Sequence, residues 1–149
     1  MQKPFYPAAI ACVYGGTDVP ELRGKVKFFE LAGSVLIEAE IKNLPENNSG
    51  FFGFHIHEGS DCSGTDFADT GSHFNPRDTV HPSHAGDMPP LLFCNGGAHL
   101  SFKTDRFKIK DIIGKTVVIH DRPDDFTTQP AGNAGKKIAC GVIKNNSHL

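Results

Sequence analysis

Short runs in which apolar and polar residues alternate recur along the chain, and they restrict its fold class. Side chains at alternate positions of a strand face opposite sides, so such runs are typical of half-buried strands. In residues 22–30, Val26 and Phe28 alternate with lysines, and the alternation continues through residues 33–44. Further strand-like runs cover residues 6–14, 52–57, 98–102, 115–120 and 138–143. We therefore expect about eight short strands.

Turn-forming residues separate these runs. The chain has 16 Gly and 10 Pro, and Asn95-Gly96-Gly97 stands where a hairpin turn is expected. We find neither a convincing amphipathic helix nor an internal repeat. Short strands joined by turns favour an all-β antiparallel sandwich or barrel. The length of 149 residues suits a single domain, residues 1–149.

Two segments, residues 58–90 and 121–135, interrupt the alternating pattern. The first is rich in Gly, Ser, Asp and Pro and shows no sustained period. Long irregular segments inside a small domain are usually functional or disordered. Both segments contain or adjoin histidines, which favours a functional site.

The charge and hydropathy of the chain exclude several classes of protein. Its formal net charge is -2, whereas nucleic-acid and membrane-surface proteins carry a basic excess. No apolar run approaches the roughly 18 residues of a transmembrane helix. The N-terminal apolar stretch lacks the cleavage site of a signal peptide. We expect no nucleic-acid or membrane partner, and a cytoplasmic location.

Histidine is abundant, with 8 residues. His55 and His57 occupy alternate positions of one expected strand, so they share a face, where they either bind a metal ion or are simply exposed. A second group, in the first irregular segment, suits a zinc site or binds nothing; it comprises His73, His81, His84 and Asp87. With His120 added, the ligands are too many for one tetrahedral ion and suit two ions that share one histidine.

Several motifs around these residues resemble the copper/zinc superoxide dismutases in type and in order. They are GFHIHE at 53–58, GSHFNP at 71–76, HAGD at 84–87, VVIH at 117–120, GNAG at 132–135 and ACGVI at 139–143. The resemblance extends from the strand around Ala8 to Ile143, and the motifs are highly specific in combination. It implies an eight-stranded antiparallel Greek-key barrel, a form of β-sandwich, with two long functional loops.

The resemblance also implies roles for the histidines. It implies one copper ion per chain, bound by His55, His57, His73 and His120. It implies one zinc ion per chain, bound by His73, His81, His84 and Asp87, so that His73 bridges the two ions. Asp124 matches the aspartate that links a copper histidine to a zinc histidine, with Asp125 as a neighbouring alternative. His99 and His148 are expected to be solvated.

The four cysteines separate into two pairs. Cys62 and Cys140 match the intrasubunit disulfide of the family, and the alternative is two buried free thiols. Cys12 and Cys94 have no such match, and we expect them to be small apolar packing residues.

Three features depart from the family pattern. The stretch between His81 and His84 is shorter than usual, and residues 121–135 lack the charged steering segment of the animal enzymes. Lys137 stands where the family has an arginine at the mouth of the copper channel. We expect Lys137 to attract the anionic substrate, the alternative being an ordinary exposed lysine.

The implied function is dismutation of superoxide to dioxygen and hydrogen peroxide, in which copper cycles between oxidation states and His73 supplies a proton. A homodimer is compatible with this interpretation, although the sequence does not set the oligomeric state. The alternative is a related protein that binds zinc only, or buffers copper, with little dismutase activity. A zinc hydrolase is disfavoured because no carboxylate stands out as a general base beside an open metal position.

Overall fold

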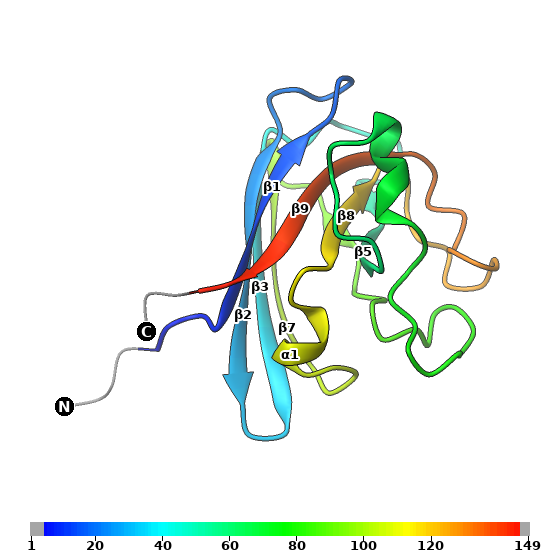
Figure 1. The fold of residues 1–149 in the computed structure, drawn as a ribbon. Helices are drawn as coiled ribbons and strands as arrows, with labels where there is room; N and C mark the ends of the chain where they lie inside the picture. The colour runs from blue at the N-terminus through cyan, green and yellow to red at the C-terminus, as the bar shows by residue number, and fades with distance from the viewer. Residues whose placement is uncertain (1–4, 147–149) are drawn as a thin grey trace.

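The computed structural model describes residues 5–146, which form an all-β fold (Figure 1). Seven strands make one antiparallel sheet in the order β5-β8-β9-β1-β2-β3-β7. Their bounds are β1 Ala9–Gly15, β2 Arg23–Leu31, β3 Ser34–Lys42, β5 Phe54–His57, β7 Gly97–Thr104, β8 Thr116–His120 and β9 Lys137–Asn145. A small second sheet pairs β4 (Phe51–Phe52) with β6 (Leu91–Leu92).

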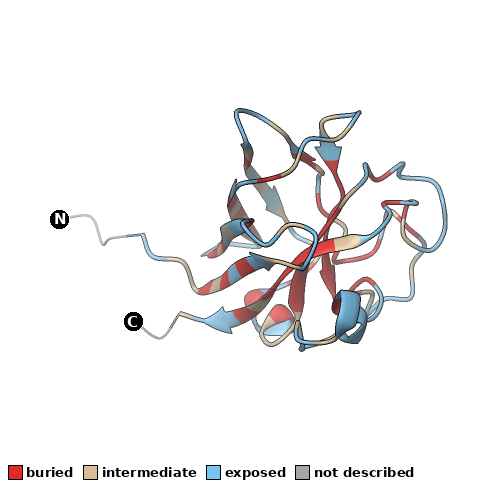
Figure 2. Cartoon of the chain, turned by 90° about the horizontal axis from the view of Figure 1, so that it is seen from above, coloured by how far each residue is buried: buried red, intermediate tan, exposed pale blue. Residues whose placement is uncertain are grey.

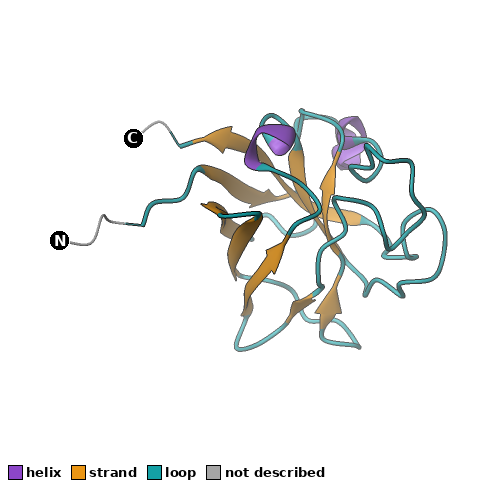
Figure 3. Ribbon diagram, turned by 90° about the horizontal axis from the view of Figure 1, so that it is seen from below, coloured by secondary structure: helices purple, strands orange, loops and turns teal. Residues whose placement is uncertain are grey.

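The strands do not follow one another in sequence order within the sheet. β9 lies between β8 and β1, and β7 lies beside β3. The first and last strands are therefore neighbours, and the two ends of the described chain leave from the same side (Figure 1). The sheet curls instead of lying flat (Figure 3). Such returns to a non-consecutive strand are typical of the Greek-key arrangement that the family resemblance implies.

Alternate residues of the long strands supply the core. Val26 and Phe28 on β2 and Ile37 on β3 are fully buried. The positions between them carry charges that lie opposite one another on the two strands, such as Lys27 opposite Glu38. The buried residues form bands along the strands in Figure 2. A slip of one residue would bring these charges inside, so the alternation fixes the register of β2 against β3.

The strand count is close to the expected eight. The described residues contain nine strands: the seven alternating runs, one of which divides at Gly53 into β4 and β5, and β6, which pairs with β4. Strands of two residues are too short to show alternation.

Two short helices lie between the strands, although no amphipathic helix is evident in the sequence. They are a 3-10 helix, Thr65–Thr70, and α1, Ile109–Ile112. Each makes only one or two turns, too few to show a helical period in the sequence. No helix in the described part of the chain is long and apolar enough to cross a membrane.

The turn predicted at residues 95–97 is confirmed. Cys94 and Gly97 exchange backbone hydrogen bonds of 2.8 and 3.1 Å. Between them, Asn95 and Gly96 have φ values of 50° and 81°. Two successive positive φ angles are typical of a tight hairpin turn, and an Asn-Gly pair adopts them at little cost. This turn leads directly into β7.

A disulfide joins Cys62, in the irregular segment 58–90, to Cys140 on β9. The predicted pairing is therefore confirmed. Cys140 is buried beside Val118 of β8, and Phe67 of the 3-10 helix packs in the same cluster. The bond fastens the long segment to the middle of the sheet.

The expectation for the other two cysteines was wrong. Cys12 and Cys94 are both exposed free thiols. Cys12 lies between buried Ala11 and Val13 on β1, so the strand alternation turns its side chain outward. Cys94 lies at the edge of the hairpin turn, where little covers it.

Replacing both Cys62 and Cys140 with alanine should lower the free energy of unfolding by about 4 kcal/mol, because the bond closes a loop of 78 residues. Urea denaturation measures this loss. The matched control replaces the exposed pair, Cys12 and Cys94, and should change stability by less than about 0.5 kcal/mol. Equal losses in the two double variants would show that the loop is held in another way.

Candidate metal centre

Strands β5 and β8 place three of the predicted histidines together. His55 and His57 alternate along β5, and His120 ends the neighbouring β8. The other two residues of β5 are apolar and fully buried in the core. The irregular segment 58–90 runs back along the histidines through isolated bridges that pair His55 with Asp87 and His57 with His73. Both sides of this short strand are therefore covered, and all its residues are buried.

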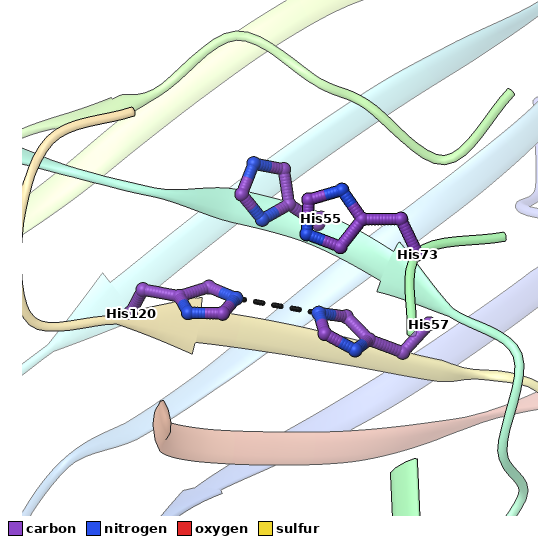
Figure 4. Close-up of side chains that lie close together, drawn as sticks. All are labelled: His55, His57, His73 and His120. Carbon is purple, nitrogen blue, oxygen red and sulfur yellow. Dashed lines mark hydrogen bonds between the residues drawn. The ribbon is translucent and has the colours of Figure 1, made fainter. Parts of the chain in front are cut away.

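The segment 58–90 adds a fourth ring to these three. One ring nitrogen from each residue lies within 4.8 Å of the others in what we name the four-histidine group: His55, His57, His73 and His120. Figure 4 shows the rings gathered from β5, β8 and the loop. His57 Nε2 and His120 Nε2 are 3.3 Å apart. Four buried imidazoles that converge in this way suit a transition-metal ion.

A second cluster, the aspartate group, adjoins the first and shares one histidine with it. It contains His73, His81, His84 and Asp87, whose ligand atoms also lie within 4.8 Å of one another. The Asp87 carboxylate is at its centre: Oδ1 is 2.8 Å from His73 Nδ1, and Oδ2 is 3.1 Å from His81 Nδ1. Oδ2 also lies 3.2 Å from His84 Nδ1. The structure thus brings together all seven residues that the sequence singled out.

Asp124 connects the two groups, because its carboxylate contacts one histidine of each. Its Oδ2 is 2.7 Å from His55 Nε2, and its Oδ1 is 2.7 Å from His81 Nε2. Burial opposes ionisation of this carboxyl, but hydrogen bonds from both rings outweigh it and hold the pKa of Asp124 below its ordinary value. The carboxylate of the neighbouring Asp125 instead accepts only from Thr127 and Thr128 of its own loop. Of the two candidates, only Asp124 makes these contacts.

The hydrogen bonds to Asp124 decide which nitrogen each ring turns inward. When Nε2–H of His81 donates to Asp124, the Nδ1 of the neutral ring carries a lone pair. That atom has no hydrogen-bond partner, although an Asp87 oxygen lies 3.1 Å away. Two acceptors so close together repel unless a cation lies between them.

Other ring nitrogens of the centre also lack a hydrogen-bond partner. Among the described residues, the buried side-chain atoms without a partner are all ring nitrogens: His55 Nδ1, His73 Nε2 and His81 Nδ1. Buried polar atoms are rarely left unsatisfied, and such exceptions call for an ion or water. The residues present therefore fit two metal ions, one for each group.

Burial keeps these rings neutral, as metal ligands must be. It holds the pKa of His57 well below its ordinary value, and the nearby His73 and His120 lower it further. Burial also lowers the pKa of His120 to about 3, with a smaller contribution from His55. The lone pairs of both rings are thus available near neutral pH.

Lys137, the first residue of β9, lies near His57 and His120 of the four-histidine group. Its Nζ donates to Thr70 Oγ1 at 2.9 Å and to the carbonyl of Gly71 at 3.0 Å. The same carbonyl accepts a hydrogen bond of 2.8 Å from His57 Nδ1. Burial lowers the pKa of Lys137. Lys137 is therefore more than an exposed lysine, because it is held by the segment that orients His57.

Two predicted bystanders and two unexpected contacts complete the centre. His99 is exposed on β7, as expected, and His148 lies outside the described residues. Sequence reasoning missed Gln129, which bonds to the backbone of His81, and Arg106, which bonds to the carbonyls of Pro82 and His84. No motif marks either residue, because their contacts are to carbonyl and amide groups that any sequence has.

Comparisons with known proteins agree with this geometry. The family model "Copper/zinc superoxide dismutase (SODC)" matches residues 22–143. A "Superoxide dismutase [Cu-Zn] 1" of Aquifex aeolicus is 39% identical over 136 residues, which cover 81% of this chain and 79% of the relative. A "Superoxide dismutase [Cu-Zn]" of Legionella pneumophila is 35% identical over 90% of this chain and 85% of its own length. The chain belongs to the copper/zinc superoxide dismutase family.

Proposed function

We propose that the chain is a superoxide dismutase, which converts two superoxide ions and two protons to dioxygen and hydrogen peroxide. The observation that carries the proposal is the sharing of His73 between two buried groups of ligands. His73 Nδ1 lies against Asp87, while Nε2, on the other side of the ring, is buried without a partner. One imidazole can therefore join two ions.

The two groups differ in chemistry, which supports a different metal for each. The four-histidine group offers only neutral nitrogen ligands, which suit copper. The aspartate group adds a carboxylate, which suits zinc and offsets part of its charge. We accordingly assign one copper to His55, His57, His73 and His120, and one zinc to His73, His81, His84 and Asp87.

Copper, when bound, supplies the redox chemistry, taking an electron from one superoxide and giving it to a second. The residues of the chain supply position and protons. Nε2 of His73 is the atom at which a proton is held and then given to the reduced oxygen, since it is buried beside the other three rings. Asp124 keeps the inward nitrogens of His55 and His81 free of protons by accepting from their outer ones.

The alternative of a zinc-only or copper-buffering protein is not favoured. Every side chain of the four-histidine group is present, buried and gathered. A hydrolase also lacks support, because Asp87 and Asp124, the two carboxylates of the centre, already bond to histidines. A homodimer and a cytoplasmic location stay predictions, for sedimentation and cell fractionation to test.

Protein loaded with Cu²⁺ and Zn²⁺ should retain one of each per chain and dismutate superoxide. His73→Ala removes the ligand that both groups share, so it should weaken metal retention and lower the dismutation rate at least about tenfold. Metal analysis and stopped-flow kinetics measure these effects. His99→Ala, which removes an exposed histidine, serves as the control and should match the wild type. A wild-type chain that held only one ion would exclude the paired site.

Asp124→Asn should weaken zinc binding by about ten- to a hundredfold. An amide oxygen can accept from one histidine, but the amide nitrogen would then face the N–H of the other, which must turn or change tautomer. A competition titration with a zinc chelator measures the change. Asp125→Asn alters the adjacent carboxylate, which does not touch a histidine, and should leave the affinity unchanged. Similar losses in both variants would rule out the specific role of Asp124.

Lys137→Ala should lower the second-order rate with superoxide by about tenfold, because a positive charge near copper raises the encounter rate of an anion. Lys137→Arg should equal or exceed the wild type, since arginine also orients the anion. The wild-type rate should fall with salt, as screening shortens to about 8 Å. Lys136, which pairs with Asp18, provides the control Lys136→Ala. If Lys137→Ala matched the wild type at low salt, Lys137 would have no guiding role.

A further inference from the structure

The backbone between the two zinc ligands His81 and His84 is held by side chains from elsewhere in the chain. Only Pro82 and Ser83 separate the two histidines. Within the segment itself, a hydrogen bond from Ser83 N–H to the carbonyl of Val80 makes one tight turn. Three carbonyl groups, those of His81, Pro82 and His84, accept from two distant residues, Gln129 and Arg106, and the His84 carbonyl also accepts from the Asp87 N–H.

The side chain of Gln129 bonds to both the N–H and the carbonyl of His81. Its Oε1 accepts from the His81 N–H at 2.9 Å, and its Nε2 donates to the His81 carbonyl at 2.7 Å. These two hydrogen bonds fix the orientation of the Gln129 amide. In the opposite orientation, its NH₂ group would face the His81 N–H and its oxygen would face the His81 carbonyl. Asp124, five residues earlier, bonds to the ring of the same histidine. One loop thus sets both the backbone and the ring of His81.

Arg106 holds the other end of the segment. It follows β7, and its Nη1 donates to the Pro82 carbonyl at 2.8 Å and to the His84 carbonyl at 3.2 Å. The guanidinium is partly buried against the loop. A planar, always charged group with several fixed donors is well suited to joining two carbonyls.

These contacts place the ligand atoms. With the backbone held on both sides of Pro82, the Nδ1 atoms of His81 and His84 lie 3.1 and 3.2 Å from the same Asp87 oxygen. A segment ordered before the metal arrives does not lose that conformational freedom on binding, so its affinity is higher.

We propose that Gln129 and Arg106 are positioning residues of the zinc site, which hold residues 81–84 in the conformation that binds the ion. This inference rests on the proposed function, which assigns zinc to the aspartate group. It adds two residues that touch neither metal nor substrate and that stand outside every motif of the site.

The test measures binding of Zn²⁺ to copper-loaded protein, in competition with a chelating indicator. Gln129→Met and Arg106→Met keep the length of the side chains but remove their donors, and each should weaken Zn²⁺ binding about tenfold. Arg106→Lys keeps the charge and a donor, so its affinity should lie between those of the wild type and Arg106→Met. Co²⁺ placed in the zinc site should show an altered visible spectrum in both Met variants.

Two controls separate positioning from general loss of stability. Thr128→Val removes a hydroxyl bond to Asp125 in the same loop, and Lys103→Met removes an exposed cation of β7. Both should keep wild-type affinity for Zn²⁺ and the wild-type Co²⁺ spectrum. Met variants that bind Zn²⁺ as tightly as these controls would overturn the inference alone. Wild-type protein that bound no Zn²⁺ would overturn the proposed function, and the inference with it.

Discussion

The carboxylate of Asp124, buried between His55 and His81, is the contact on which the metal centre depends. An imidazole offers two nitrogens, and a neutral ring has one proton to place. Because Asp124 accepts from the outer nitrogen of each ring, the inner nitrogen of each is left as a ligand. The Asp124 side chain therefore sets the tautomer of one ligand in each group. As a direct result, the inner nitrogens of His55 and His81 have no hydrogen-bond partner.

The two groups of ligands are held by different kinds of secondary structure: the first mainly by strands and the second by an irregular loop. Three residues of the four-histidine group come from β5 and β8, whose backbones are paired in the main sheet. All four residues of the aspartate group come from the irregular segment 58–90, three of them between positions 81 and 87. Extended strands need little further support, whereas the loop is tied by the disulfide to β9 and by Arg106 and Gln129 to its neighbours. The irregular half of the site thus has the larger number of external attachments.

The sequence predicted the strands well where apolar and polar residues alternate, and the ligands well where histidine or aspartate side chains mark them. Alternation located β2 and β3, and the spacing of His55 and His57 placed both rings on one face. β6 and the two short helices were missed because two to six residues cannot show a period. Cys12 and Cys94 were misjudged because cysteine does not itself indicate which side of a strand faces the core. Gln129 and Arg106 escaped notice because they recognise backbone, which no motif encodes.

The pairing of the first strand with the last has a consequence for how the chain folds. β1 lies between β2 and β9, and Ala9 pairs with Asn145 near the ends of the described chain. Contacts so distant in sequence form slowly, because a long stretch of chain must be ordered to bring them together. During synthesis, β2 follows β1 early, but β9 is complete only once the chain has been made through residue 145. Until then, the other side of β1 is an unpaired strand edge, open to pairing with another nascent chain.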